Sequence, residues 1–277
     1  CIIPYARGPV RSLSLQDAAA QAEKLAGEGY RELVLTGIEI SSWGRDFKDG
    51  ARLIDLVEAV CAAAPGCRVR LGSLEPRTVT EDFCVRAAKL PNLCPHFHLS
   101  MQSGCDATLK RMNRKYDTAR FYESVSLLRK RFDAPAVTTD MIVGFPGETE
   151  EEFSQSLDFI RRCAFSAMHI FPYSRRPGTP AASMPGQTVK AVREERAGRA
   201  VVIAGGMERD YLSQFVGQTV EVLFEEERDG LWRGHTTRYC RVEVRSEEPL
   251  HNQLRQVSVT GVGDGYLEGE LLNLENR

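Results

Sequence analysis

The amino-acid sequence predicts an α/β domain, built on a parallel sheet that is closed or nearly closed into a barrel, followed by a small all-β barrel. Between residues 14 and 171, helix-like and strand-like segments alternate, and this alternation favours parallel strands joined by right-handed crossovers. From residue 217 the pattern changes to short strands separated by glycine-containing turns, which is typical of a small antiparallel barrel. A chain of 277 residues is long enough for one domain of roughly 200 residues and a smaller one.

The α/β part alternates in a regular order. Residues 15–28 are alanine-rich with an apolar face at helical spacing, and residues 32–37 form a short apolar strand that ends in glycine. Thr149 and Glu152 form a capping box, which fixes the start of one helix. In chain order, the remaining elements expected here are helix 53–64, strand 68–71, helix 80–90, strand 96–100, helix 118–132, strand 137–143, helix 149–162 and strand 167–171.

The C-terminal part is predicted to contain a connecting helix and short strands. A segment rich in proline, serine and glycine at residues 181–186 leads into a charged helix over about residues 190–215. We therefore divide the chain into an α/β domain at 1–187, a connecting helix at 188–213 and a small barrel at 214–277. The barrel strands expected, with a charged hairpin turn at 225–230, are 219–224, 231–236, 241–244, 256–261 and 266–271.

Composition indicates a cytoplasmic protein without a membrane partner. Hydrophobic residues make up 42% and charged residues 27%, as is usual for soluble globular proteins, and no run approaches the ~20 apolar residues of a membrane span. Eight scattered cysteines without a CxxC pair indicate reduced thiols. The cysteines expected to act as small buried core residues are Cys61, Cys67, Cys84, Cys163 and Cys240.

Glycine, proline and polar residues follow every predicted strand of the α/β part. In parallel α/β sheets, ligands bind at the carboxyl ends of the strands. Turn formation alone explains roughly half of the glycines and prolines, but their coincidence on one rim favours a binding site. The segments concerned are 36–37, 72–76, 100–104, 144–148 and 173–179.

Several of these segments resemble the motifs of the radical S-adenosylmethionine (SAM) methylthiotransferases, which modify tRNA and ribosomal protein. The matching stretches are CIIPYARG at 1–8, LSMQSGCD at 99–106, MNRKY at 112–116, TDMIVGFPGET at 139–149 and FPYSRRPGTPA at 171–181. The resemblance covers essentially the whole chain. It implies a partial (β/α)6 TIM-like barrel of the radical SAM type, followed by a TRAM domain, a small OB-like barrel that binds RNA.

The resemblance also implies cofactors and partners. Cys1 corresponds to the third cysteine of the family's CxxxCxxC loop, and thus to a ligand of the 4Fe–4S cluster that binds SAM; thiolates suit iron–sulfur ligation. The first barrel strand, the other two cysteines and a domain holding an auxiliary 4Fe–4S cluster are expected before Cys1, so this chain alone is expected to be inactive. In the family, an electron from the cluster cleaves SAM, and the radical formed takes hydrogen from C2 of an adenine before sulfur insertion and methylation. The implied partners are tRNA, an electron donor and a sulfur source.

Residue roles follow from position and chemical type within this resemblance. Gly37 lets main-chain carbonyls come close to the methionine amino group, Arg114 presents a planar fork suited to the SAM carboxylate, and the loop from Gly144 offers a main-chain edge to adenine. Cys105 is expected to pack, not to bind iron. The residues expected to bind SAM are Thr36, Gly37, Ser73, Glu75, Gln102, Ser103, Arg114, Gly144, Phe145, Pro146 and Tyr173.

The substrate is predicted from two further stretches, LTGIE at 35–39 and SWGRD at 42–46. They resemble the branch that acts on N6-threonylcarbamoyladenosine beside the tRNA anticodon. That substituent carries a carboxylate, which needs a paired donor when buried, and Arg175 and Arg176 are the candidates. Two alternatives, isopentenyladenosine in tRNA and a ribosomal-protein side chain, stay open; a non-catalytic RNA-binding protein is disfavoured because the SAM-side motifs are all present.

Charge limits where RNA can bind. The net charge of −2 gives no general support for nucleic-acid binding. From residue 214 onward the chain carries seven arginines, no lysine and twelve acidic residues. Binding of RNA must therefore depend on a few placed arginines of the small barrel, among which we select Arg233 and Arg238, or on the basic clusters of the α/β domain.

Overall fold

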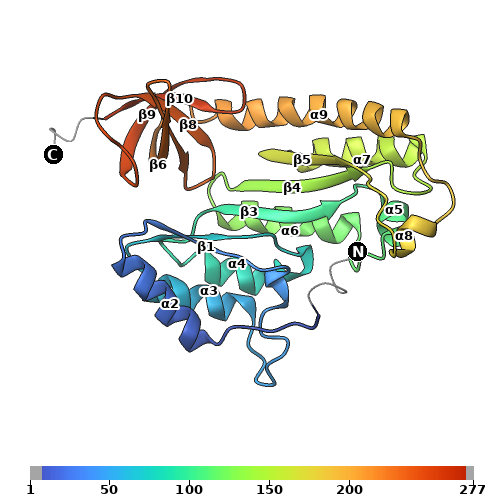
Figure 1. Cartoon of the computed structure of the whole chain (residues 1–277), viewed down its shortest axis with the longest axis horizontal. Coiled ribbons are helices and arrows are strands. Elements are labelled where there is room, and N and C mark those ends of the chain that lie inside the picture. Colours follow the sequence, from blue (N-terminus) through green and yellow to red (C-terminus); the bar gives the residue numbers. More distant parts are fainter. Residues whose placement is uncertain (1–7, 273–277) are drawn as a thin grey trace.

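The computed structural model describes residues 8–272 and consists of an open half-barrel with helices on its outer face and a small closed barrel at one end (Figure 1). Cys1, the expected iron ligand, lies outside the described residues. Among residues 8–272, no helix combines the length and the apolar content that a membrane crossing requires.

Five parallel strands form the half-barrel, as predicted. β1 (Glu32–Leu35) pairs with β2 (Arg68–Leu71), and β3 (His96–Gln102), β4 (Ala136–Val143) and β5 (Ala167–Pro172) form a second set. Two isolated bridges, Val69 to Leu93 and Leu74 to Leu99, join the sets. The described sheet is open, as the partial barrel implied by the resemblance requires, and not closed, because five strands span only part of the circle that an eight-stranded barrel completes.

Helices cover the convex face of the sheet. They are α2 (Leu15–Gly27), α3 (Leu53–Ala63), α4 (Glu81–Ala87), α5 (Asp106–Arg111), α6 (Thr118–Arg131) and α7 (Glu150–Cys163), and two short 3-10 turns, η1 (Ile40–Ser42) and η2 (Pro76–Thr78), follow β1 and β2. The predicted capping box is confirmed, since the Glu152 N–H donates to Thr149 Oγ1 and the Thr149 N–H donates to Glu152 Oε2, both at 3.2 Å.

Alternation along β3 separates the core from the concave face. Phe97, Leu99 and Met101 are completely buried in the core cluster shared with the helices. His98 and Gln102, at the alternate positions, are only partly buried and lie on the concave face. The cysteines of the described residues are all free and buried, which confirms the prediction for the five core cysteines.

The C-terminal barrel is closed and five-stranded. Its strands are β6 (Thr219–Arg228), β7 (Leu231–Thr236), β8 (Arg241–Arg245), β9 (Leu254–Val262) and β10 (Leu267–Leu271), in the order β10-β8-β7-β6-β9. The small barrel is confirmed, but the expectation that it is wholly antiparallel was wrong. Four neighbouring pairs are antiparallel, whereas β8 and β10 are parallel. A closed ring with an odd number of strands cannot alternate direction throughout.

A long helix connects the two parts. After α8 (Pro180–Ser183), the 24-residue helix α9 (Lys190–Ser213) runs back beside β5 and ends at the small barrel (Figure 1). An α-helix of this length spans about 36 Å. α9 therefore carries the chain from the carboxyl ends of the strands to their amino ends.

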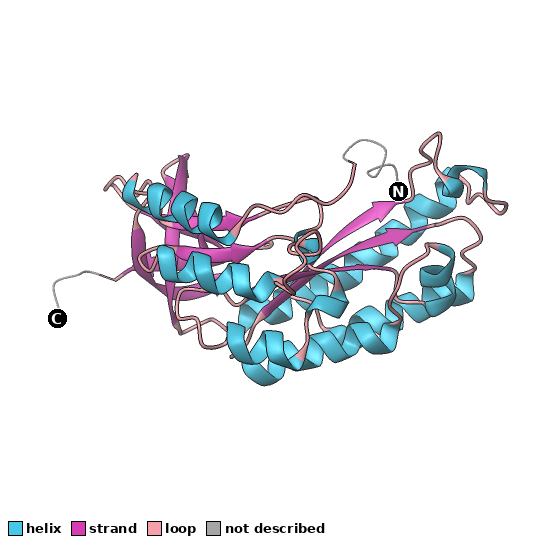
Figure 2. Ribbon diagram, turned by 90° about the horizontal axis from the view of Figure 1, so that it is seen from below, coloured by secondary structure: helices cyan, strands magenta, loops and turns pink. Residues whose placement is uncertain are grey.

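The small barrel sits at the amino ends of the half-barrel strands. Arg68 and Arg70, on β2, donate hydrogen bonds to the main-chain oxygens of His235 (3.3 Å) and Thr237 (2.9 Å). Arg238 donates to the oxygen of Ala134, directly before β4, at 2.9 Å. Figure 1 shows the barrel at the end of the molecule opposite to α5 and α8, and Figure 2 shows the same separation from below.

Candidate functional site

The loops after the five strands come together at one edge of the half-barrel, opposite to the small barrel. Hydrogen bonds between main-chain atoms join them: the N–H of Gly72 donates to Leu35 at 2.8 Å, and the N–H of Tyr173 donates to Val143 at 2.8 Å. The N–H of Ser100 donates to Leu74 at 3.0 Å. The polar and glycine-rich segments identified in the sequence thus form one rim, as expected.

The loops after β1 and β2 are tightly packed. A Cβ on Gly37 would lie 3.0 Å from the Ile40 side chain, so the turn has little room for a larger residue. The N–H of Glu75 donates to Ser41 Oγ at 2.8 Å, and the Glu75 carboxylate pairs with Arg77 and, at 3.7 Å, with Arg45. Glu75 is therefore already neutralised by arginines, and the SAM contacts of Thr36, Gly37, Ser73 and Glu75 stay predictions.

The turn between β3 and α5 packs against α7. Gln102 adopts a left-handed conformation with φ of 66°, and Ser103 is completely buried, with its hydroxyl 3.3 Å from Ser156 Oγ. A Cβ on Gly104 would lie 2.9 Å from the Ser156 Cα, which explains the glycine. The Ser103 hydroxyl thus contacts α7. Cys105 is buried with its thiol 3.3 Å from Gln155 Oε1, consistent with a packing role.

The loop after β4 is held by α9. Gly144 has a φ of +71°, and a Cβ there would lie 2.3 Å from Cγ of Arg193. The Gly144 N–H donates to Glu148 Oε2 at 2.6 Å, and Arg196 Nη1 donates to the same oxygen at 2.9 Å. Burial raises the pKa of Glu148, although the Gly144 N–H and Arg196 oppose that shift. The sequence did not single out Arg193 or Arg196, because arginines in a helix rich in charge give no sign of which ones are buried.

Two buried hydroxyls at the rim lack a hydrogen-bond partner among the described residues. They are Tyr173 Oη, beside the edge-on ring of Phe145, and Ser42 Oγ in the turn after β1. Buried polar atoms without a partner are uncommon and require an explanation. Gly147, which is left-handed and exposed, brings main-chain atoms to the surface, whereas Gly144 is left-handed but buried. Tyr173 was among the predicted residues and Ser42 was not.

Three predicted arginines lie on the rim. Arg114 follows α5 in an exposed turn, and the neighbouring Tyr116 hydroxyl donates to the main-chain oxygen of Ser100 at 2.5 Å, so the turn is tied to β3. Arg175 and Arg176 are exposed in the loop after β5. The positions of these side chains do not test whether Arg114 binds the SAM carboxylate or whether Arg175 and Arg176 bind the substrate carboxylate, so both assignments stay predictions.

The two arginines selected in the small barrel have partners within the protein. Arg233 pairs with Glu243 at 2.9 Å. Arg238 donates to the main-chain oxygens of Ala134 and Asp133, at 2.9 and 3.0 Å. These contacts give both side chains a structural role, and their contacts with RNA stay predictions.

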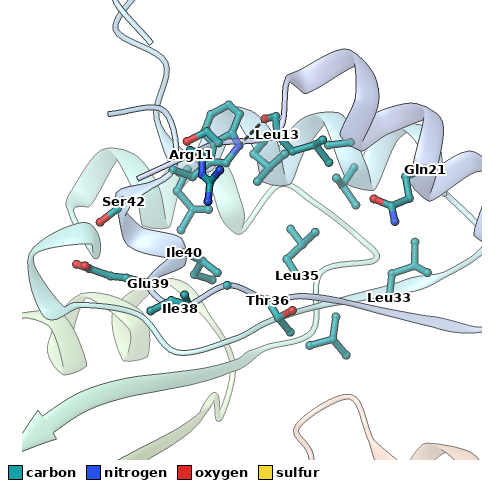
Figure 3. A pocket seen from close by; sticks show the side chains of 18 of the residues that line it. Arg11, Leu13, Gln21, Leu33, Leu35, Thr36, Ile38, Glu39, Ile40 and Ser42 are labelled. Atoms are coloured by element: carbon teal, nitrogen blue, oxygen red, sulfur yellow. Dashed lines mark hydrogen bonds between the residues drawn. The ribbon is translucent and has the colours of Figure 1, made fainter. Parts of the chain in front are cut away.

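A cavity of about 960 Å³ lies beside β1, between α2 and α3 (Figure 3). Its walls include the apolar side chains of Leu33, Leu35 and Ile40, and Thr36 lies between Leu33 and Ile38 along the wall. Within residues 8–272, β1 pairs with β2 alone, so the cavity borders a strand edge that has no partner there. The sequence did not predict this cavity.

Comparison with known proteins identifies the family. The family model described as the Radical SAM superfamily matches residues 1–160. The chain belongs to the radical SAM superfamily. Members of this superfamily use a 4Fe–4S cluster together with SAM, which agrees with the cofactors expected from the sequence. The predicted fold is confirmed at the same time, because the match includes β1 to β4 of the half-barrel, β5 continues the same parallel sheet, and the small closed barrel follows.

Curated relatives in the superfamily extend over the whole chain. Threonylcarbamoyladenosine tRNA methylthiotransferase MtaB of Bacillus subtilis (strain 168) is 36% identical over 99% of this chain and 62% of its own length. A tRNA-2-methylthio-N(6)-dimethylallyladenosine synthase of Chloroflexus aurantiacus is 36% identical over 97% of this chain and 59% of its own. The chain therefore spans about three fifths of the length of these relatives.

Solved structures show the fold alone. The radical SAM methyltransferase TsrM of Kitasatospora setae matches with a TM-score of 0.51 at 17% identity, covering 61% of this chain and 30% of that one. Methylornithine synthase matches with a TM-score of 0.50 at 14% identity, covering 72% and 56%.

Proposed function

We propose that this radical SAM chain is part of a tRNA methylthiotransferase that converts N6-threonylcarbamoyladenosine, next to the anticodon, to its 2-methylthio derivative. The observation that carries the proposal is the similarity to the Bacillus subtilis enzyme of that name, at 36% identity over 99% of the chain. The rim of loops, with two buried hydroxyls that have no partner within residues 8–272 and the left-handed Gly147, supports the proposal. We place the enzyme in the cytoplasm.

Residues of this chain would bind and orient the cofactors. When bound, the cluster and SAM supply the radical that takes hydrogen from C2 of adenine. Cys1 would be one thiolate ligand of the cluster. Tyr173, whose hydroxyl has no partner within residues 8–272, would donate a hydrogen bond to SAM. The loop from Gly144 to Gly147 would offer a main-chain edge to adenine at its exposed end, Gly147. Arg114 would hold the SAM carboxylate through two parallel N–H bonds.

The remaining parts of the reaction would come from sequence before Cys1 and from partners. A strand preceding Cys1 would pair with the free edge of β1 and fill the cavity between α2 and α3. A further domain would hold an auxiliary 4Fe–4S cluster. An electron donor and a sulfur source would complete the reaction. The greater length of the curated relatives supports this arrangement.

The carboxylate of the threonylcarbamoyl group would be bound by Arg175 or Arg176. Both are exposed on the loop after β5, at the rim where the cofactors would lie. A second candidate substrate is dimethylallyladenosine, because relatives named for that nucleoside are 32% to 36% identical to this chain. That substituent is apolar and would leave both arginines without a ligand.

Nucleoside mass spectrometry with two tRNAs decides between these substrates. The full-length enzyme, reconstituted with iron and sulfide under anaerobic conditions, is incubated with tRNA bearing either modification. We expect the 2-methylthio product from threonylcarbamoyladenosine and almost none from the dimethylallyl nucleoside. Equal or inverted preference would show that the substrate assignment is wrong even though the reaction class is right.

The role of Cys1 is tested separately in the full-length protein. Cys1→Ala should abolish the SAM-binding cluster, which is measured as iron content and visible absorption after reconstitution. Cys240→Ala, at a buried residue of the small barrel, is the matched control and should retain the cluster. A Cys1→Ala protein with a full complement of iron in that cluster would contradict the assignment.

A further inference from the structure

We propose that the carboxylate of Asp140, on the concave face of the half-barrel, accepts a hydrogen bond from an N–H of a planar base. His98, Thr138 and His96 act as positioning residues, because they hold that carboxylate through a chain of polar contacts of fixed direction. The inference rests on the proposed function, since the base is the adenine of the tRNA, and it names the group that binds one edge of that base. Both candidate nucleosides keep an N–H at N6, so the inference does not depend on which of them reacts.

Strand alternation brings a carboxylate and aromatic rings together on the concave face. Asp140 of β4 lies opposite His169 of β5 in the strand register, and residues on either side of each face the core. His169 is exposed, and Phe171, two residues further along β5, is 50% exposed with its ring centroid 6.4 Å from that of His169. An exposed aromatic ring beside a carboxylate offers a stacking surface and a hydrogen-bond acceptor, which together suit an unpaired base.

The Asp140 carboxylate is held on one side and accessible on the other. His98, on the neighbouring strand β3, places Nε2 at 3.4 Å from Asp140 Oδ2. The side chain of His98 is 14% exposed and that of Asp140 is 29% exposed. The histidine therefore fixes the orientation of the carboxylate without covering it, and a ligand can reach the acceptor.

The direction of the chain follows from a buried nitrogen of His96. Thr138 Oγ1 lies 3.0 Å from His96 Nε2 and 3.0 Å from His98 Nδ1. Burial, with a smaller contribution from Arg70, lowers the pKa of His96 to about 3, so its ring carries one proton at neutral pH. His96 Nδ1 is buried without a partner in the described part of the chain. Because buried N–H groups without an acceptor are rare, the proton belongs on Nε2, which donates it to Thr138.

The two remaining contacts are then determined. The Thr138 hydroxyl has a single proton, and since it accepts from His96, it donates to His98 Nδ1. His98 therefore carries its own proton on Nε2, which is directed at Asp140. The carboxylate requires the same arrangement, because a nitrogen lone pair at 3.4 Å from its oxygen would be repelled. Both ends of the chain thus require one pattern of protons.

The small barrel holds the first member of this chain. Tyr239 stacks on His96, with ring centroids 5.1 Å apart and an angle of 17° between the rings. The guanidinium group of Arg70 lies 4.8 Å from the centroid of the Tyr239 ring. The small barrel therefore positions the His96 ring and, through Thr138 and His98, the carboxylate on the concave face.

Nitrogen NMR of the full-length protein with isotope-labelled histidine measures the proton positions directly. At about pH 8, above the ordinary histidine pKa of about 6.5, we expect His96 and His98 to carry their protons on Nε2. The two sets of signals are assigned from their loss in H96F and H98F. A proton on Nδ1 of either histidine overturns the positioning chain.

Two stem-loop RNAs that differ by one amino group test the contact with the base. Both carry the anticodon sequence, one with adenosine beside the anticodon and the other with purine riboside, which has hydrogen in place of the amino group. Fluorescence anisotropy on the full-length, reconstituted protein gives the two affinities. A hydrogen bond to a charged acceptor strengthens binding roughly tenfold to a hundredfold. We therefore expect the wild-type protein to prefer the adenosine RNA by about tenfold or more.

Substitutions at the acceptor and in the chain should change this preference in different ways. D140N should abolish it, because the amide oxygen accepts from His98 and the amide NH₂ group then meets the N–H of the base. D158N makes the same change in a surface ion pair with Arg161 and, as the matched control, should retain the preference. T138V removes the hydroxyl at nearly constant shape and should lower the preference, whereas T138S keeps the hydroxyl and should retain it.

The outcomes distinguish this inference from the proposed function. A D140N protein with the wild-type preference overturns Asp140 as the acceptor, and equal preferences in T138V and T138S overturn the positioning chain; the tRNA substrate stands in both cases. If T138V does not fold, the proton positions in the wild-type protein decide the same point. A wild-type protein that binds both RNAs equally overturns the inference, while nucleoside mass spectrometry still tests the function. A wild-type protein that binds neither RNA overturns the tRNA substrate and the inference with it.

Discussion

Replacing Glu32 by glutamine should destabilise the whole chain, because this carboxylate neutralises two buried arginines at the joint between the half-barrel and the small barrel. Arg68 Nε donates to it at 2.9 Å, and Arg70 donates to it through Nε and Nη2, both at 2.8 Å. The two arginine side chains are only 7% and 3% exposed. Glutamine keeps the shape and one acceptor oxygen but removes the charge.

The size of the destabilisation follows from the two guanidinium groups that lose their carboxylate partner. Removing one partner of a buried ion pair costs about 3–5 kcal/mol. Both guanidinium groups keep hydrogen bonds to main-chain oxygens of the small barrel, at 2.9 to 3.3 Å, so the lower end, about 3 kcal/mol, is expected. For a domain of this size a loss of that order lowers the melting temperature by roughly 6–12 °C.

Denaturant unfolding at pH 7 is the assay, with Glu81→Gln as the matched control. Glu81 pairs with Arg131 on the surface, where ion pairs contribute little, so its variant should unfold like the wild-type protein. Burial favours a higher pKa for Glu32, but the hydrogen bonds and charges of Arg70 and Arg68 outweigh it and lower that pKa from 4.5. The stabilising contribution is therefore complete at neutral pH and is lost as the pH falls below 4.5. Equal midpoints for Glu32→Gln and wild type would refute this reasoning.

Two further predictions concern a buried histidine and a buried hydroxyl. Burial, with a smaller contribution from the charge of Arg70, lowers the pKa of His96 from 6.5 to about 3. Below pH 6.5 the imidazole of His96 binds a proton in the unfolded chain but not in the folded chain, so the free energy of unfolding should fall by about 2 kcal/mol between pH 6.5 and 5. His96→Phe should abolish that fall. An NMR titration midpoint for His96 near 6.5 would contradict the prediction. Tyr173→Phe should leave stability unchanged, because the hydroxyl has no partner in the described part of the chain, and should weaken SAM binding roughly two- to twelvefold through one lost hydrogen bond. Equal SAM affinities in calorimetry would remove Tyr173 from the site.

Local patterns in the sequence were enough to predict the elements of the fold. Helix caps and strand alternation depend on neighbours along the chain, so the capping box at Thr149 and the apolar strand ending near Gly37 could be identified directly. The rim was predictable for the same reason, since parallel strands place their following loops at one edge. The parallel pair of β8 and β10 could not be read in this way, because it follows from closure of the whole ring.

Contacts between distant segments were the part that the sequence did not reveal. Arg196 and Arg199 occur one turn apart in the same charged helix, yet the side chain of Arg196 is 6% exposed and that of Arg199 is 41% exposed. Burial of Arg196 depends on Glu148, which approaches from another loop 48 residues earlier. Arg238 was similarly assigned to RNA from its charge alone, before its main-chain partners near β4 were known.

Two arginines on β2 explain why the small barrel occupies its position. In the sequence RVRL of β2, Val69 and Leu71 enter the core, which directs Arg68 and Arg70 to the concave face. Buried guanidinium groups require acceptors, and the described half-barrel provides Glu32 while the turn of the small barrel provides main-chain oxygens. Tyr239 of that turn also stacks on His96, with ring centroids 5.1 Å apart. The small barrel therefore closes the amino ends of the strands and leaves the carboxyl ends, where the rim of loops lies, uncovered by it.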